Sequence, residues 1–83
     1  MIFTAGIKVM PLKELLDPQG KAVMNGLANL GISAIQDVRI GKFITLQIET
    51  PTKEEAYTLA EEAAKKLLAN AVMEAFEIEI KPL

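Results

Sequence analysis

The sequence predicts an α+β fold whose elements follow the order β-α-β-β-α-β. Segments at both ends of the chain alternate apolar and polar residues with the period of a strand. Two segments between them have the capping residues and apolar spacing of helices. Gly41-Lys42 separates two further strand-like runs, as the turn of a two-residue hairpin does.

The first strand is expected over residues 2–9, where alternate side chains form one strongly apolar face. Pro11 follows shortly after and has no backbone N–H to donate, so regular ladder pairing should end near it. The apolar face consists of Phe3, Ala5, Ile7 and Val9.

A helix should begin at Asp17-Pro18, because Asp caps free N–H groups and Pro loses nothing at the first helical position. Gly31 follows the last helically spaced apolar residue, where a left-handed conformation ends many helices. Gly20 and Gly26 are poor helix formers. We interpret Gly26 as the place where this helix approaches the sheet closely.

Two strands are expected around the hairpin, over residues 35–40 and 43–49. Ile44, Leu46 and Ile48 share one face of the second strand, and its opposite face is mostly polar. The final strand, residues 76–81, alternates apolar residues with Glu and Lys in the same way.

The second helix begins with a capping box, Thr52-Lys53-Glu54-Glu55, directly after Pro51. Asn70 is expected to end it. Pairs of Glu and Lys four residues apart should line its solvated face, Glu61 with Lys65 and Glu62 with Lys66. Its apolar stripe is predicted to contain Ala56, Leu59, Ala60, Ala63, Leu67 and Leu68.

Together these elements predict a four-stranded antiparallel sheet with two helices on one face, related to ferredoxin-like folds. The whole chain, residues 1–83, should form one domain. The face without helices would expose Ile2, Phe43 and Ile35, which favours contact between subunits. We therefore expect a homo-oligomer built from dimers.

Composition excludes several kinds of chemistry. The chain has no Cys and no His, which removes disulfides, thiol nucleophiles, imidazole catalysis and Cys or His zinc ligands. Nine Lys and Arg against eleven Asp and Glu give a net charge of −2, which argues against nucleic-acid binding. The N-terminus lacks the basic region of a signal peptide, and no apolar run is long enough to cross a membrane. A cytoplasmic protein is expected.

Two polar clusters have both a structural and a binding interpretation. The helix start at Asp17 could bind an anion, but capping is the better interpretation since Asp would repel a phosphate. Arg39 beside the hairpin could hold a carboxylate or phosphate, although a surface ion pair or subunit contact is the better interpretation. The acidic residues of the second helix are interpreted as a solvated face rather than as catalytic carboxylates.

Three stretches resemble the small PurS subunit of phosphoribosylformylglycinamidine (FGAM) synthase, at matching spacings over nearly the whole chain. They are Leu16-Asp17-Pro18-Gln19-Gly20-Lys21-Ala22, Gln36-Asp37-Val38-Arg39-Ile40-Gly41-Lys42 and Leu67-Leu68-Ala69-Asn70. The chain departs from the family pattern in the turn before the first stretch and in Ala71, where the family often has Pro.

The resemblance implies a subunit that carries no catalytic, cofactor-binding or metal-binding residues. It would bridge the glutaminase and the larger synthetase subunit in de novo purine biosynthesis, and assist ammonia transfer between them. The complex would use ATP and magnesium to convert formylglycinamide ribonucleotide to its amidine. The family also forms dimers and tetramers. Positions that match the family motifs are the candidates for subunit contacts: Asp17, Gln19, Arg39 and Lys42.

Two other functions remain open on the residues alone. A regulatory ferredoxin-like dimer could bind a small molecule between subunits, with Gly20 and Gly26 permitting close approach. A small enzyme could use Lys42 or a lone carboxylate, but that requires an ionisable group with a strongly perturbed pKa in an apolar pocket. No cluster of apolar and ionisable residues indicates such a pocket.

Overall fold

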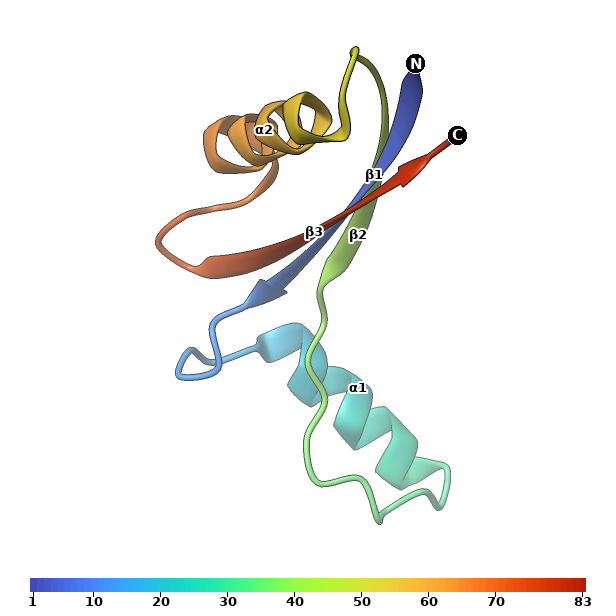
Figure 1. Ribbon diagram of the computed structural model, residues 1–83. Coiled ribbons are helices and arrows are strands. Elements are labelled where there is room, and N and C mark those ends of the chain that lie inside the picture. Colours follow the sequence, from blue (N-terminus) through green and yellow to red (C-terminus); the bar gives the residue numbers. More distant parts are fainter.

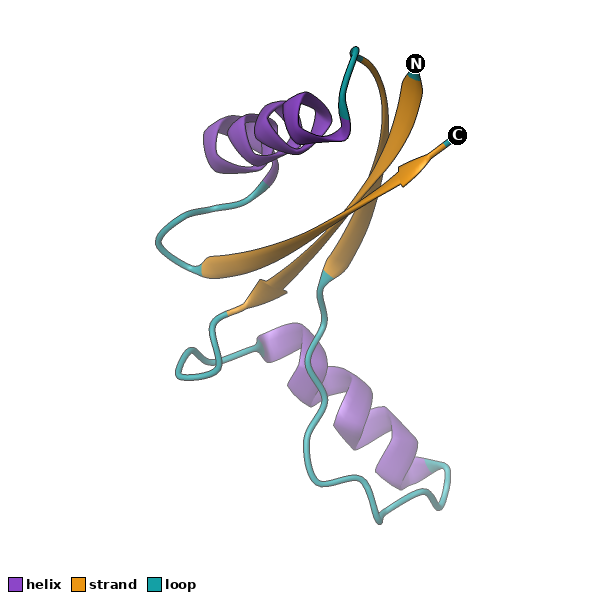
Figure 2. Ribbon diagram, in the orientation of Figure 1, coloured by secondary structure: helices purple, strands orange, loops and turns teal.

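The computed structural model describes residues 1–83 and contains three strands and two α-helices (Figures 1 and 2). A π-helical turn, Ala64–Leu68, continues the second helix. In chain order the main elements are β1 (Ile2–Pro11), α1 (Pro18–Asn29), β2 (Lys42–Glu49), α2 (Lys53–Ala63) and β3 (Glu74–Pro82). Neither α-helix is long and apolar enough to cross a membrane.

The sheet has the strand order β2-β1-β3, and β1 pairs with both neighbours in antiparallel register. Ile7 in the middle of β1 lies opposite Ile44 of β2 and Ile78 of β3. The outer edges of β2 and β3 have no neighbouring strand. The alternation predicted for all three segments is confirmed, because their apolar residues lie on the face toward α2.

The core lies between that face and α2 (Figure 1). Three alanines of the second helix, Ala56, Ala60 and Ala64, are fully buried and let the helix backbone approach the sheet closely. The predicted apolar stripe is wrong at Leu59 and Leu67, which are 47% and 83% exposed. The π-helical turn changes the angular spacing of side chains beyond Ala64, so α-helical spacing no longer applies to Leu67.

The predicted helix caps are confirmed. The Asp17 carboxylate accepts a hydrogen bond from the Gly20 N–H at 3.0 Å, and the Thr52 hydroxyl accepts one from Glu55 N–H at 3.2 Å. Gly31 has a φ of 87°. Its N–H and that of Ile32 bond back to the last turn of α1, which is the pattern of a Schellman motif.

The predicted strand over residues 35–40 is wrong, and so is the hairpin at Gly41-Lys42. The sheet has three strands rather than four, and residues 32–41 form no ladder. A strand requires a hydrogen-bonding neighbour, and this segment leads away from the sheet, so that neither of the two free edges lies beside it (Figure 1). Side-chain groups bond part of it instead, since Ile40 N–H donates to the Asp17 carboxylate.

The prediction that both helices cover one face of the sheet is also wrong. Only α2 packs on the sheet, whereas α1 projects away from it (Figure 1). No atom lies within 4 Å of the position a Cβ would take on Gly26, so that glycine marks no close approach. The chain is therefore elongated, with a radius of gyration of 16.3 Å against about 12 Å for a compact domain of this length.

The sheet face opposite α2 is open, as the sequence predicts, but Ile35 does not lie on it because residues 32–41 form no strand. Phe43 lies on it at 66% exposure and is in contact with Gly6, where a Cβ would be 2.6 Å from the ring. Ile2 on the same face is 39% exposed. Only ten of the 83 residues are buried, which leaves much apolar surface without cover.

Candidate subunit-contact site

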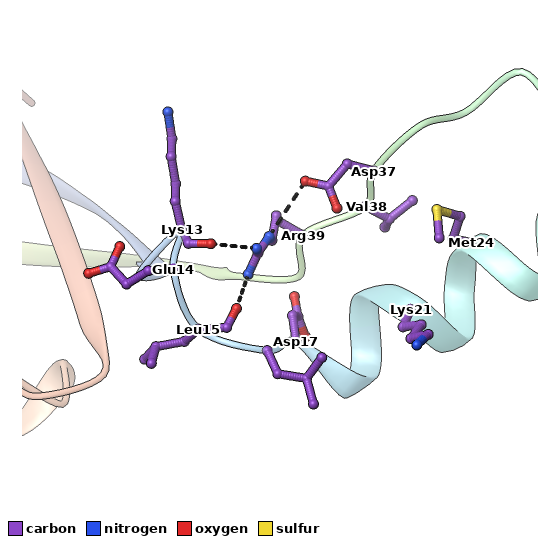
Figure 3. Close-up of a pocket in the computed structure, with 10 residues that line it drawn as sticks. Lys13, Glu14, Leu15, Asp17, Lys21, Met24, Asp37, Val38 and Arg39 are labelled. Atoms are coloured by element: carbon purple, nitrogen blue, oxygen red, sulfur yellow. Dashed lines mark hydrogen bonds and ion pairs between the residues drawn. The ribbon is translucent and has the colours of Figure 1, made fainter.

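The candidate residues cluster where the chain leaves the sheet and returns to it. We call residues 18–38, which include α1, the arm, and we call residues 13–17 and 39–41 the neck. The chain runs out through residues 13–17 after β1 ends, and it comes back through residues 39–41 just before β2 begins. Asp17 and Arg39 lie on the two opposite passages of this neck (Figure 3).

Arg39 joins the two passages. One terminal nitrogen of its guanidinium donates to the Leu15 carbonyl and the other to the Lys13 carbonyl, each at 2.7 Å. Asp37 lies 3.6 Å from its Nε and forms an ion pair. The Arg39 side chain is only 27% exposed. Arg39 lies on the returning passage, and its planar guanidinium therefore binds two carbonyls of the outgoing passage.

Asp17 makes a second connection. One carboxylate oxygen accepts from Gly20 N–H inside α1, and the other accepts from Ile40 N–H at 2.8 Å, 23 residues further along the chain. The hydrogen bond from Ile40, followed by that from Gly20, lowers the pKa of this carboxyl below its ordinary value of 3.8. Asp17 is therefore both the cap of α1 and a tie to the returning passage.

Two glycines allow the passages to come this close. A Cβ on Gly20 would lie 2.0 Å from the Val38 carbonyl oxygen. A Cβ on Gly41 would lie 2.4 Å from the Val9 carbonyl oxygen, at the end of β1. Any larger residue at either position would displace the backbone opposite it.

A hollow of about 400 Å³ opens beside these contacts, between the neck and the first turns of α1 (Figure 3). Its charged lining is balanced and so favours neither anions nor cations. The six charged residues are Lys13, Glu14, Asp17, Lys21, Asp37 and Arg39. Figure 3 shows the Lys13 ammonium directed away from the Arg39 guanidinium, with only its carbonyl turned inward.

Gln19 and Lys42, the other two candidates, do not join this network. Gln19 is exposed on the first turn of α1, and Lys42 is exposed at the start of β2 opposite Val9. Neither side chain makes a hydrogen bond or an ion pair within the chain. The structure thus brings Asp17 and Arg39 together and leaves Gln19 and Lys42 facing solvent.

The sequence did not reveal the glycines and carbonyls that complete this site. Gly20 within the first turn of a helix is the available signal, whereas the sequence interpretation expects the close approach at Gly26. The carbonyls of Lys13, Leu15 and Val38 give no signal in the sequence, because every residue has one.

The charged side chains of the neck bind main-chain groups of the same chain. Its carboxylate and guanidinium are occupied by main-chain N–H and C=O groups. The structure contains no group of three or more acidic residues that could hold a metal ion. Gly20 is buried against Val38, so it offers no space for the small-molecule approach considered above.

Comparisons with known proteins identify the family. The family model of PurS, described as phosphoribosylformylglycinamidine (FGAM) synthase, matches residues 4–82. The PurS subunit of this enzyme from Bacillus subtilis is 44% identical over 71 residues, which cover 84% of this chain and 83% of that protein.

Solved structures agree with this match. The crystal structure of Bacillus subtilis PurS superposes with a TM-score of 0.87 at 36% identity, over 96% of this chain and 99% of that one. A chain in the structure of PurLQS from Thermotoga maritima gives a TM-score of 0.90 at 30% identity, over 98% and 99%. The chain therefore belongs to the PurS family and is a subunit of FGAM synthase, a ligase of purine biosynthesis.

Proposed function

We propose that this chain is a non-catalytic subunit that holds the glutaminase and synthetase subunits of FGAM synthase together and helps enclose the path of ammonia between them. The observation that carries the proposal is the projecting arm, which leaves apolar residues of α1 without cover in the single chain. Free ammonia is protonated and diluted in bulk water, so its transfer needs an enclosed route rather than a catalytic side chain.

The exposed surface supports a role in assembly. The chain has 6006 Å² of accessible surface, about 1,100 Å² more than a compact monomer of this mass. One partner in a stable interface covers about 800 Å². The excess is therefore of the size that contact with another chain would remove.

We further propose that the first such contact is with a second copy of this chain. The outer edge of β2 has no neighbour, and α2 lies mainly over β3 and β1. The inner face of β2 is consequently only half-buried. Residues 32–40 have no regular secondary structure, are apolar at intervals and form no ladder within the chain. Residues 32–40 of one copy could lie along β2 of the other and supply the fourth, ferredoxin-like strand.

The four candidate residues have different places in this proposal. Gln19 and Lys42, with exposed and unoccupied polar groups, are the candidates for direct subunit contacts. Asp17 and Arg39 border the same surface, but their polar groups are engaged within the chain. The ATP and magnesium of the reaction would be bound by the other subunits, because this chain lacks a suitable group of ligands.

The assembly role is tested by turnover. Glutamine-dependent amidine synthesis by the synthetase and glutaminase subunits is measured with and without this chain, beside the same reaction supplied with ammonium. We expect this chain to restore the glutamine-dependent reaction and to change the ammonium reaction little. Absence of any response, together with failure of the three proteins to co-elute, would refute the proposal.

A matched pair of variants tests the homodimer. Leu30 lies in the arm directly after α1 and is 77% exposed, whereas Leu67 lies outside the arm and is 83% exposed. Asp should therefore be tolerated at either position in the monomer. Sedimentation equilibrium should show a monomer for Leu30→Asp and an intact dimer for Leu67→Asp. Equal dimerisation of both variants would show that the arm is not the interface.

A further inference from the structure

The arm is fastened to the sheet at the neck alone. α1 has no substantial packing contact with the sheet or with α2, and Figure 1 shows it standing clear of both. Three hydrogen bonds cross between the two passages of the neck, two from Arg39 and one to Asp17. The direction of the arm relative to the sheet thus depends on a small set of named contacts.

These contacts are well suited to fixing a direction. All three bonds are charge-assisted, and two of them run from one planar guanidinium to carbonyls two residues apart, which restricts rotation as well as separation. The third joins the first turn of α1 to the residue that leads into β2. Gly20 against Val38 and Gly41 against Val9 leave the passages no room to slide past one another.

We propose that Asp17 and Arg39 are positioning residues for the subunit interface, whose side chains act by holding the arm at one angle to the sheet rather than by binding groups of the partner. This inference rests on the arm-mediated homodimer proposed above. An arm that is already fixed loses less conformational freedom when it associates, so a rigid neck strengthens binding without adding a contact.

Asp17→Asn separates the two roles of Asp17. Asn is as good an N-cap as Asp, so α1 should still begin at the same residue. An amide has only one acceptor oxygen, and its NH₂ group cannot accept the N–H that the second carboxylate oxygen holds. Arg39→Lys keeps the positive charge but loses the fork that reaches both carbonyls. Glu14→Gln is the matched control, since Glu14 is an exposed carboxylate of the same neck that makes no hydrogen bond or ion pair within the chain.

The angle of the arm can be measured directly because the chain has no native cysteine. Spin labels on Asn29→Cys, at the end of α1, and Thr58→Cys, on the exposed side of α2, report one distance by double electron–electron resonance. Dilution of the labelled chain with excess unlabelled chain restricts the signal to pairs within one copy. Amide exchange in β1 verifies that the sheet is intact in each variant.

We expect a narrow distance distribution in the parent chain and in Glu14→Gln, and a broad one in Asp17→Asn and Arg39→Lys. The dimer dissociation constant should rise roughly tenfold in the same two variants, because association must then order an arm that is mobile in the free chain. The amide hydrogen exchange rates of β1 should be the same in all variants.

Narrow distributions in both neck variants would overturn the proposal. Broad distributions without loss of dimer affinity would overturn it too, because the angle of the arm would then not affect the interface. A result that refutes the homodimer itself can be distinguished from these two outcomes. The parent chain would be monomeric at every concentration, and the positioning role would be rejected with it.

Discussion

Gly20 lies against the carbonyl oxygen of Val38, and a Cβ on Gly20 would be only 2.0 Å from it. These two residues belong to opposite passages of the chain, one inside the first turn of α1 and the other just before the neck. The contact is between a helix and a segment without regular secondary structure. The small size of glycine therefore lets α1 and the returning chain meet at this point, next to the hydrogen bond from Ile40 to Asp17.

Gly20→Ala should destabilise the arm, because the new methyl group collides with backbone that cannot move aside. We expect the free energy of unfolding to fall by about 1–3 kcal/mol, less any gain in helix propensity. Gly26→Ala is the matched control in the same helix, with nothing within 4 Å. It should raise stability by about 0.5–1 kcal/mol. Urea unfolding compares the two, and stabilisation by both would contradict this account.

The Asp17 connection should weaken in acid. Backbone N–H groups of Ile40 and Gly20 lower the pKa of the Asp17 carboxyl, so its ionised form is favoured in the folded chain. Its stabilising contribution is therefore complete above 3.8, the ordinary pKa, and is lost as pH falls through the lower folded value. An NMR titration of the carboxyl carbon should show a midpoint below 3.8. A midpoint at or above that value would mean that these hydrogen bonds are absent in solution.

Ile7 should be the most costly single truncation in the sheet. It is fully buried in β1, and its neighbours across the sheet are Ile44 and Ile78. Ile7→Ala should lower the free energy of unfolding by about 2–5 kcal/mol, because it leaves a cavity between the sheet and α2. Ile2→Ala, at the exposed end of the same strand, should cost much less. Equal losses in urea unfolding would show that the core is not where the structure places it.

Thermal stability should depend on protein concentration. Only ten residues are buried in the single chain, and the proposed second copy would cover further apolar surface. For a folded dimer that unfolds to monomers, each tenfold rise in concentration adds about 1.4 kcal/mol of stability per dimer. The melting temperature should rise accordingly in a dilution series by calorimetry, and less steeply for Leu30→Asp. A constant melting temperature would indicate a monomer that is stable alone.

Features set by neighbouring residues were predictable from the sequence. Asp17, Thr52 and Gly31 mark helix ends through bonds that reach only a few residues along the chain. Alternation in β1, β2 and β3 indicated which face is apolar, and the structure buries that face against α2. The motifs around Asp17, Arg39 and Asn70 also pointed to the correct family.

The sequence by itself determined where helices and apolar faces occur, whereas only the tertiary structure decided which of these segments meet. Residues 35–40 have the pattern of a strand, but no edge of the chain's own sheet lies beside them. In the same way, α1 has the pattern of a packed helix but projects from the neck. Strand pairing and helix packing depend on partners far away in sequence or on another chain. A local pattern specifies the need for such a partner without specifying its position.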